Sequence, residues 1–445
     1  MVGNSLFKKQ TIRDIELVGK TVLLRADYNV PLKDGAITND YRIQQSLPTI
    51  QYLLKHNVKL VICSHLGRPK GPYDESVSLK PVAVRLQELL GKQVSFVHGN
   101  FTEAAKTVAS LKPGQVALLE NLRYNPGEEQ NDVEFAKQLA SLADIFVQDG
   151  FGVVHRAHAS TEGVTHFLPS VAGLLLEREV DTITYVMSQP KHPLMAIVGG
   201  AKIADKIDIL HRFIKIADFV AIGGAMANTF LKAIGHDVAA SLYDKNELSV
   251  AKDIMSEAAA EAKKRRFIFY IPQDGVVATK LDKSAPTRIV DWSTHVIAEI
   301  ENYPKRPTVQ ASKIAEHEMI LDIGPFSGAF IAGAIQLVDT VVWNGTMGVT
   351  ETEGLQGPVG PFAHGTDLIM EAMLGQFGDS KHRPFSLVGG GDTVGYVEQR
   401  GLVEAFGHVS TGGGASLELM AGRKLPGVEA LFDKGSAGNQ SNHER

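Results

Sequence analysis

The segment LMAIVGGAKIADK (194–206) decides how this chain is interpreted. Five apolar residues, Leu194–Val198, come first, and two glycines and two lysines follow within the next eight residues. A short apolar run that ends in a glycine turn is typical of a strand buried on both faces of a parallel sheet. The segment therefore predicts a strand, a tight turn, and a helix that carries Lys202 and Lys206 on one face.

The same pattern recurs along the whole chain. Helix-like segments, such as Glu177–Ser188 and Ser249–Arg266, lie between the apolar runs. This alternation predicts an α/β fold with parallel sheets. The runs are Thr21–Leu24, Lys59–Cys63, Val116–Leu119, Ile145–Val147, Leu194–Val198, Phe219–Ile222, Phe267–Ile271, Met319–Ile323, Thr340–Trp343, Phe385–Val388 and His408–Val409.

The composition narrows the class of protein. Apolar residues make up 44% and charged residues 21% of the 445, as in a globular protein with a large core. A net charge of −5 argues against nucleic acid or an anionic membrane as the main partner. The single cysteine, Cys63, forms no intramolecular disulfide, which favours a reducing, cytoplasmic setting. The most apolar long stretch, Ser327–Trp343, is shorter than the ~20 residues of a membrane span.

Basic and hydrogen-bonding residues follow the strands of the first half. The carboxyl ends of parallel strands share one edge of a sheet, where ligands bind. Each arginine alone is more simply a surface ion pair, but the placement recurs four times, and gathered like charges favour a small, multiply anionic substrate. The candidates are Arg25, Asp27, Asn29, Arg42, His65, Arg68, Arg123, His155, Arg156 and His158.

In the second half of the chain, glycines rather than basic residues follow the predicted strands. A glycine-containing turn follows each of five apolar runs: Gly199-Gly200, Gly223-Gly224, Asn344-Gly345-Thr346-Met347-Gly348, Gly389-Gly390-Gly391 and Gly412-Gly413-Gly414. Glycine turns that open helices expose backbone N–H groups to phosphate, although they also permit close packing of helix on sheet. Five such turns, two of them with lysine or Asp392-Thr393 attached, favour a nucleotide, and Asp392 is a candidate Mg²⁺ ligand.

Several standard motifs are missing. The chain has no G-x-x-x-x-G-K-[ST] segment, so a P-loop is excluded. His155-Arg156-Ala157 is not the His-Arg-Asp loop of protein kinases. Residues 389–394 fail the G-x-G-x-x-G pattern at the last position, which counts against the alternative of a nicotinamide-dependent dehydrogenase.

Together the motifs resemble the phosphoglycerate kinase family. The matching segments stand in the family's order and cover nearly the whole chain. They are RADYNVP (25–31), SHLGRP (64–69), ENLR (120–123), HRAHAS (155–160), GGAKIADK (199–206), GGAMANTFL (223–231), VWNGTMG (342–348), GGGDT (389–393) and STGGGASLE (410–418).

The resemblance implies two doubly wound, Rossmann-like α/β domains joined by a hinge helix. Residues 1–184, joined by about 415–445, would bind phosphoglycerate, and residues 185–414 would bind the nucleotide. The family transfers the acyl phosphate of 1,3-bisphosphoglycerate to Mg-ADP, reversibly, and gives 3-phosphoglycerate and Mg-ATP. We expect a monomer in the cytoplasm. Hinge candidates are the helix before Gln189 and the turn Ser410–Gly414.

The family's residue roles carry over by position. Phosphoglycerate would be bound by Asp27, Asn29, Arg42, His65, Arg68, Arg123 and Arg156, with Arg25, His155 and His158 completing the rim. The nucleotide would be bound by Lys202, Lys206, Gly390, Gly391, Asp392 and Thr393, with Asp392 on Mg²⁺ and Glu351 or Glu353 on ribose. Arg42 and Lys202, assisted by the N–H groups of Gly390 and Gly413, would stabilise the transition state.

The chain departs from the family's usual pattern at a few positions. Thr346 replaces the usual proline, Thr350 an aromatic residue and Phe326 a common lysine, and residues 351–362 form a longer stretch. The phosphate-handling positions are intact, which counts against a second alternative, a non-catalytic relative that only binds partners.

Overall fold

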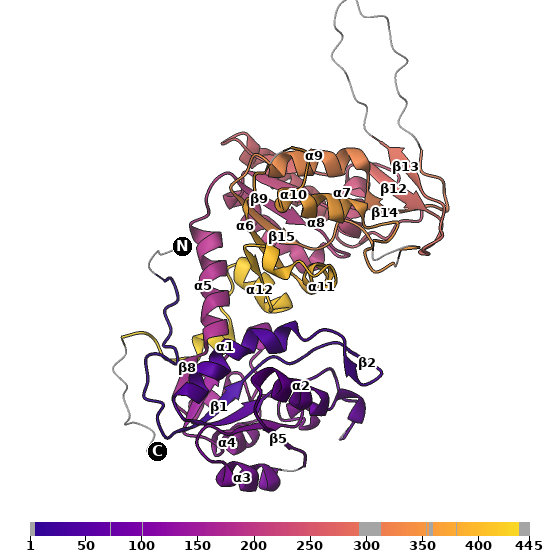
Figure 1. The fold of residues 1–445 in the computed structure, drawn as a ribbon. Helices are drawn as coiled ribbons and strands as arrows, with labels where there is room; N and C mark the ends of the chain where they lie inside the picture. Colours follow the sequence, from indigo (N-terminus) through magenta and orange to yellow (C-terminus); the bar gives the residue numbers. More distant parts are fainter. Residues whose placement is uncertain are drawn as a thin grey trace, which may run out of the picture. The chain divides into compact units, whose positions relative to one another are not determined.

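The structure, a computed structural model, describes residues 5–71, 73–99, 101–292, 313–352, 354–355, 359–379 and 381–435. The chain divides into two compact units (Figure 1). Unit 1 comprises Met1–Tyr185 and Thr411–Arg445, and unit 2 comprises Val186–Ser410. The helix α5 (Leu174–Ser188) begins in unit 1, and its last residues belong to unit 2. Residues 411–414, which the sequence analysis placed in the second domain, belong to unit 1.

Unit 1 is built on one parallel sheet of six strands. Its central strand, β1, pairs with β4 on one side and β7 on the other. The spatial order is β5 (Val94–Val97), β6 (Val116–Leu119), β4 (Lys59–Cys63), β1 (Thr21–Arg25), β7 (Ile145–Gln148) and β8 (Ser170–Ala172).

Helices cover both faces of this sheet because alternate strand residues point to opposite sides. Val22 and Leu24 share one core with the helices α1 (Tyr41–Lys55) and α2 (Lys80–Leu90). Leu23, between them, belongs to a second core with α3 (Phe101–Ser110) and α4 (Val133–Ala140). Strands buried on both faces explain why the runs are continuously apolar.

Unit 2 has its own parallel sheet of six strands. The spatial order is β11 (Ile268–Tyr270), β10 (Phe219–Ile222), β9 (Leu194–Val198), β15 (Thr340–Asn344), β16 (Phe385–Gly389) and β17 (His408–Val409). In chain order these are strands 3-2-1-4-5-6, the order of a doubly wound Rossmann-like sheet, which has its switch point between β9 and β15.

The helices of unit 2 lie between these strands along the chain. They are α6 (Ile207–Ile216), α7 (Gly224–Ala233), α8 (Leu248–Ala262), α9 (Pro325–Ile335), α10 (His364–Met373) and α11 (Gly391–Gln399). Two short helices in the last part of the chain, α12 (Gly413–Met420) and α13 (Pro426–Glu429), belong to unit 1.

One predicted parallel strand is antiparallel. Met319–Ile323 forms β14, which pairs with β12 (Asp274–Ala278) in a separate three-stranded antiparallel sheet that also contains β13 (Arg288–Asp291). The prediction was wrong because a short apolar run looks the same in either direction, and the chain direction of the partner decides. A further antiparallel pair, β2 (Leu32–Lys33) and β3 (Ala36–Ile37), was not predicted.

The basic run at residues 263–266 lies at a helix end. α8 ends at Ala262, four residues before the predicted end, and Lys263 is its C-terminal cap. Arg265 donates hydrogen bonds to the carbonyl oxygens of Ala217, at 2.7 Å, and Ile214. These carbonyls lie at the end of α6, where arginine satisfies groups that lack a helical partner.

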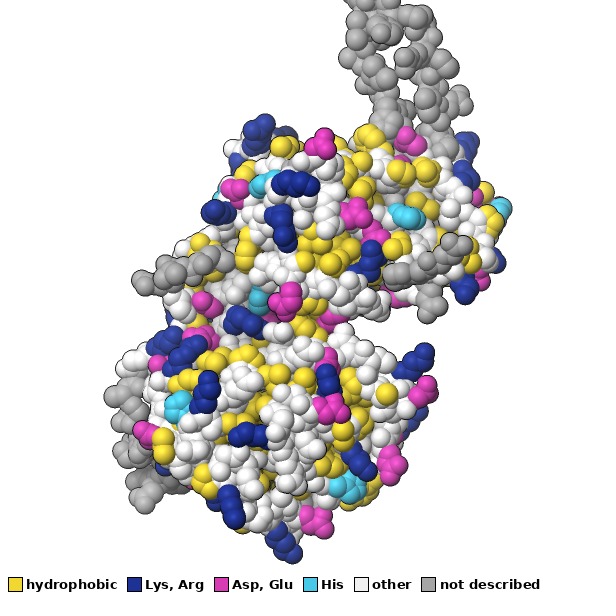
Figure 2. Space-filling view, viewed as in Figure 1, with side chains coloured by type: hydrophobic (Ala, Val, Ile, Leu, Met, Phe, Trp, Pro, Cys, Tyr) yellow, Lys and Arg dark blue, Asp and Glu magenta, His cyan; other side chains and the backbone are white. Residues whose placement is uncertain are grey.

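The surface carries no extended field of one sign on the face seen in Figure 2, where lysines and arginines are interspersed with aspartates and glutamates. An anion site on that face therefore depends on local placement of charge. Among the described residues, no helix combines the length and the apolar character needed to cross a bilayer.

Glycines allow the turns after β9 and β15 to touch. A Cβ on Gly199 would lie 2.1 Å from the carbonyl oxygen of Thr346. A Cβ on Gly345, whose φ is +99°, would lie 2.2 Å from the carbonyl oxygen of Gly199. These two glycines are therefore required by close packing of the strand ends, whatever else the turns bind.

This packing predicts the effect of adding one methyl group. Gly199→Ala should destabilise unit 2 by about 1–3 kcal/mol, because backbone has to move to make room. Gly333→Ala, inside α9 with nothing within 4 Å of the added Cβ, should instead stabilise the unit by about 0.5–1 kcal/mol. Urea unfolding followed by tryptophan fluorescence reports on unit 2, which contains Trp292 and Trp343. Equal stability of the two variants would contradict the packing role.

Candidate functional site

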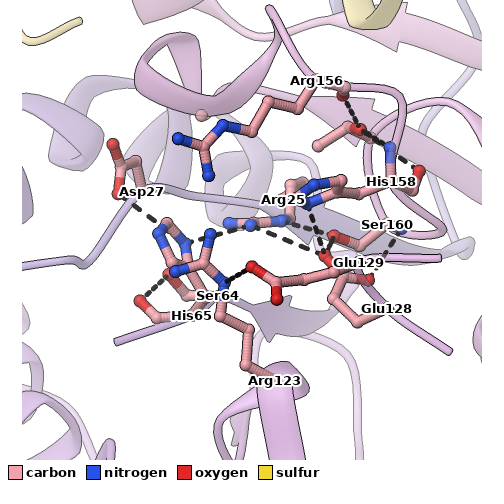
Figure 3. Close-up of polar contacts among 12 residues, drawn as sticks. Arg25, Asp27, Ser64, His65, Arg123, Glu128, Glu129, Arg156, His158 and Ser160 are labelled. Atoms are coloured by element: carbon pink, nitrogen blue, oxygen red, sulfur yellow. Dashed lines mark hydrogen bonds and ion pairs between the residues drawn. The ribbon is translucent and has the colours of Figure 1, made fainter. Parts of the chain in front are cut away.

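The predicted basic residues of unit 1 follow the carboxyl ends of its strands. Together they form what we call the basic rim: Arg25, Asp27, Asn29, Arg42, His65, Arg68, Arg123, His155, Arg156 and His158. Figure 3 shows Arg25, Asp27, His65, Arg123, Arg156 and His158 gathered in one place. β1, β4 and β7 are adjacent and parallel, so Arg25, His65 and the segment after Gln148 reach the same edge of the sheet.

Arg25 is the last residue of β1 and is only 1% exposed. Its Nε donates to the hydroxyl of Ser160 at 2.7 Å, and its Nη1 donates to its neighbour's carbonyl at Ala26. Its Nη2 lies 3.2 Å from Nδ1 of His65. A guanidinium inside a protein needs such partners because burial without them is costly.

Asp27 and Arg42 form a contact at the mouth of the rim. Nη1 of Arg42 lies 3.2 Å from the Asp27 carboxylate and donates to the Asn29 carbonyl at 3.0 Å. Burial alone would raise the pKa of Asp27, but the charges of Arg42 and Arg25, together with the hydrogen bond from the backbone N–H of Asn29, hold it below its usual value. A Cβ on Gly152 would lie 2.1 Å from this carboxylate, so the glycine after β7 makes room for it.

Arg123 lies deeper than the other rim arginines outside β1. Its Nη1 donates to the Gly67 carbonyl at 2.7 Å, and its Nε lies 3.1 Å from the carboxylate of Glu129. Burial, together with the charges of Arg156 and Arg25, lowers the pKa of Arg123 and outweighs Glu129. Positive charge is therefore crowded at this point, and a bound anion would relieve it.

Two of the rim arginines are exposed, and hydrogen bonds hold the backbone next to one of them. Arg68 and Arg156 are exposed. The backbone N–H of Gly67 donates to Oδ1 of Asn29 at 2.9 Å, and the Gly67 carbonyl accepts from Arg123. Gly67 is thus held by both its N–H and its carbonyl group, which fixes the backbone from which the Arg68 side chain extends.

The rim histidines contribute hydrogen-bonding groups rather than charge. Burial lowers the pKa of His65 well below its usual value and the pKa of His158 to about 4. Burial also lowers the pKa of His155, with the charge of Arg156 acting in the same direction. A like charge nearby and loss of water both disfavour the imidazolium form.

Sequence reasoning missed the acidic residues behind the rim. Glu128 is fully buried and accepts hydrogen bonds from Ser160, while Glu129 pairs with Arg123 (Figure 3). The signal was the pair Glu128-Glu129 close after ENLR (120–123), in a segment with no strand or helix periodicity. The role of Glu128 could have been inferred only from a predicted fold in which residues 128 and 160 are in contact.

In unit 2 the lysines do not stand on a helix as predicted. Lys202 is exposed and lies in an irregular segment, and Lys206 ends the 3-10 turn η5 (Ala204–Lys206), immediately before α6. The prediction was wrong because the glycine turn continues as a tight 3-10 turn before α6 starts. The two side chains are therefore positioned by the turn rather than by helical spacing.

Lys206 is the more constrained of the two lysines. Its Nζ donates to Oδ1 of Asn344, the last residue of β15. Burial lowers the pKa of Lys206 to about 8, although the carboxylates of Asp392 and Asp205 oppose the shift. Lys206 thus lies at the switch point of the sheet, between the ends of β9 and β15.

A cavity of about 380 Å³ opens beside these strand ends within unit 2. Its lining includes Gly200, Ala225, Leu321, Met347, Glu351 and Asp392. The volume and the mixture of apolar surface with a few polar groups are those of a site for a small organic ligand. Two candidates that are distant in sequence, Glu351 and Asp392, are thus brought to one cavity.

The remaining nucleotide candidates lie at the start of α11. Gly390, with φ +92°, is the N-terminal cap, and a Cβ on Gly391 would meet nothing within 4 Å. Thr393 is buried, and its hydroxyl accepts from the Gly345 N–H at 2.6 Å. The other glycine candidate, Gly413, starts α12 in unit 1, and a Cβ on its neighbours Gly412 and Gly414 would lie 2.3 Å from Phe151 and 3.2 Å from His155. The alternative ribose candidate, Glu353, lies outside the described residues.

Comparison with known proteins decides the family. The family model described as phosphoglycerate kinase matches residues 12–423. The chain belongs to the phosphoglycerate kinase family. The phosphoglycerate kinase of Moorella thermoacetica is 45% identical over 429 residues, which cover 96% of this chain and 100% of that protein. The enzyme of Pelotomaculum thermopropionicum is 43% identical over 427 residues, with the same coverage.

Solved structures of the family are similar in fold. The phosphoglycerate kinase of Coxiella burnetii matches with a TM-score of 0.76 and 34% identity, over 95% of this chain and 98% of that one. The enzyme of Pyrococcus horikoshii matches with a TM-score of 0.76 and 29% identity over the same shares. The match to phosphoglycerate kinases therefore spans both units.

The environment of Lys206 predicts its titration. Its ammonium should lose a proton near pH 8, and because the unfolded value is higher, Lys206 should make unit 2 more stable as the pH rises above 8. Asp392→Asn should lower the pKa of Lys206 further, since one opposing carboxylate is lost. The ¹³C resonance of the lysine Cε, assigned by its absence in Lys206→Met, measures this. Titration of that resonance above pH 10 would contradict the buried environment.

Proposed function

We propose that the basic rim binds phosphoglycerate, that the cavity of unit 2 binds the nucleotide, and that phosphate passes directly between them. As a phosphoglycerate kinase, the chain is a glycolytic enzyme that transfers phosphate between 1,3-bisphosphoglycerate and ADP. The observation that carries the residue assignment is the concentration of guanidinium groups at one strand edge of unit 1.

The chemistry of the rim suits a small, multiply charged anion. Arg42 and Arg123 supply planar donor groups that match phosphate and carboxylate oxygens, and the buried Arg25 adds positive charge behind them. The carboxylate of Asp27 and the amide of Asn29 lie beside them and suit the 2-hydroxyl group of phosphoglycerate. Arg68 and Arg156 are exposed and can approach a ligand that enters from solvent.

The unit 2 site fits a nucleotide. Asn344 is buried, and its Nδ2 has no hydrogen-bond partner among the described residues. That nitrogen would lie 3.1 Å from a Cβ on Gly390, so it faces the glycine turn that opens α11. A phosphate oxygen at the turn would satisfy it. Glu351 lines the same cavity, where a carboxylate suits ribose hydroxyls.

Asp392 fits the role of magnesium ligand. It is exposed in the first turn of α11 and lines the cavity. Mg²⁺ prefers one or two carboxylates together with phosphate oxygens and water, which this single carboxylate beside a nucleotide would provide. When bound, Mg²⁺ would neutralise charge on the transferring phosphate.

Catalysis then depends on placement and positive charge. The nucleophile is already anionic, so no general base is needed, and transfer requires in-line alignment with charge stabilisation on the equatorial oxygens. We assign this stabilisation to Arg42 and Lys202, with the N–H groups of Gly390 and Gly413. These groups come from both units, so hinge motion at α5 and at Ser410–Gly414 would bring them to one phosphate and exclude water. We further propose a cytoplasmic monomer.

A coupled assay tests the reaction. With 3-phosphoglycerate and MgATP, the acyl phosphate formed is reduced by an added NADH-dependent enzyme, and we expect a fall in NADH absorbance. Each single omission of 3-phosphoglycerate, ATP or coupling enzyme should abolish the signal. A dehydrogenase would oxidise NADH without the coupling enzyme, and a non-catalytic relative would give no signal under any condition.

Arg42 should be needed for the rate of transfer. Arg42→Ala should lower kcat by about 10³-fold, the scale of losing an arginine that stabilises phosphoryl transfer. Arg85→Ala is the control, because Arg85 is not part of the basic rim and forms partly exposed ion pairs with Asp40 and Glu88, and its kcat should stay within about twofold of the unmodified enzyme. Steady-state kinetics measure both, and an Arg42→Ala kcat within a few-fold of normal would refute the assignment.

A further inference from the structure

Glu128 is a buried carboxylate that the proposed reaction does not use. It is 0% exposed. Its Oε2 accepts from the backbone N–H of Ser160 at 3.0 Å, and its Oε1 accepts from the hydroxyl of Ser160 at 2.6 Å. Oε1 also lies 4.0 Å from Nη2 of Arg25 and 3.9 Å from Nδ1 of His158. Burial raises the pKa of Glu128, while Arg25 and Ser160 pull it back.

A series of hydrogen bonds links Glu128 to His65 through Ser160 and Arg25. The direction of each bond follows from which groups carry a proton. The Ser160 hydroxyl has one proton, and Arg25 can only donate. Ser160 therefore accepts from Nε of Arg25, at 2.7 Å, and gives its own proton to Glu128. The carboxylate thus fixes the orientation of the serine, and the serine fixes the guanidinium.

The same logic sets the tautomer of His65. Nη2 of Arg25 lies 3.2 Å from Nδ1 of His65, and since arginine is only a donor, Nδ1 must accept. The proton of the neutral ring is therefore on Nε2. The charged groups around this ring are Asp27, which favours the imidazolium form, and Arg25, Arg123 and Arg42, which oppose it. His65 thus has an N–H donor on the ring atom remote from Arg25.

We propose that Glu128 is a positioning residue of the basic rim, which acts through Ser160 and Arg25 to hold His65 as the Nε2–H donor for an anionic ligand. Figure 3 shows Arg25 lying between His65 on one side and Ser160 with Glu128 on the other. The proposal rests on the assignment of the rim to phosphoglycerate. A purely structural carboxylate would stabilise the fold without controlling the histidine tautomer.

Glu128→Gln tests the proposal because it keeps the shape and removes the charge. The first readout is the ¹⁵N NMR spectrum of the histidine rings, with His65 assigned by its absence in His65→Gln. Each carboxylate oxygen of Glu128 accepts one bond from Ser160, and glutamine replaces one of these oxygens by an NH₂ donor, so Ser160 and Arg25 lose their fixed orientation. We therefore expect a single Nε2–H tautomer in the unmodified protein and a mixture in Glu128→Gln. The second readout is kinetic: KM for 3-phosphoglycerate should rise about tenfold, the cost of one hydrogen bond to a charged group, while KM for ATP stays unchanged.

Glu120→Gln is the matched control. Glu120 follows β6 at the same edge of the sheet, and its carboxylate accepts from Ser78, Leu79 and Asn121. It also lies 3.3 Å from Nδ1 of His98, and within the described part of the chain it has no arginine as a hydrogen-bond partner. It carries the same change of charge, and both readouts should stay as in the unmodified enzyme. If Glu128→Gln does not fold, Ser160→Ala removes the same relay and should give the same two changes.

The outcomes separate the proposals. An unchanged tautomer in a folded Glu128→Gln protein overturns the positioning role. A changed tautomer with an unchanged KM for 3-phosphoglycerate overturns the assignment of the rim to that substrate. The same rise in KM for Glu120→Gln would show a general effect of charge at the sheet edge, and the specific role of Glu128 would be refuted.

Discussion

A buried guanidinium at the end of the central strand is the constraint on which unit 1 depends. Arg25 is only 1% exposed, and a charge in that position is tolerated only with partners around it. The chain supplies them from remote positions: Ser160 after β7, His65 after β4, and Glu128 between β6 and α4. These partners tie three loops to one strand end, and so hold the loops that carry the other arginines.

This arrangement leaves positive charge on the basic rim that its own acidic groups do not fully compensate. The acidic groups lie behind or beside the arginines, and the pKa values of Arg123 and His158 are lowered by burial and by neighbouring positive charge. In unit 2 the constraint is steric. Its strand ends approach so closely at Gly199 and Gly345 that side chains at these two positions are excluded. Main-chain groups and the side chains of Lys206 and Asn344 are left at the switch point.

The sequence predicted most strands of both parallel sheets, because strands buried on both faces produce continuous apolar runs that end in turn residues. It failed for β14, since an apolar run carries no information on the direction of its partner. It also misplaced Lys202 and Lys206, because glycine turns give no signal for an intervening 3-10 turn. Glu128 was missed because its role arises only where residue 128 meets residue 160.

The sequence by itself determined the α/β class, the family and the identity of the charged residues, because these follow from local patterns and from motifs in fixed order. Only the tertiary structure decided which of these groups are charged, which are paired and which face a cavity. The physical reason is that burial and neighbouring charge set protonation and hydrogen bonding, and both depend on contacts between residues far apart in the chain. His65 illustrates this: its place in a motif was readable, but its tautomer depends on Arg25, which is forty positions away.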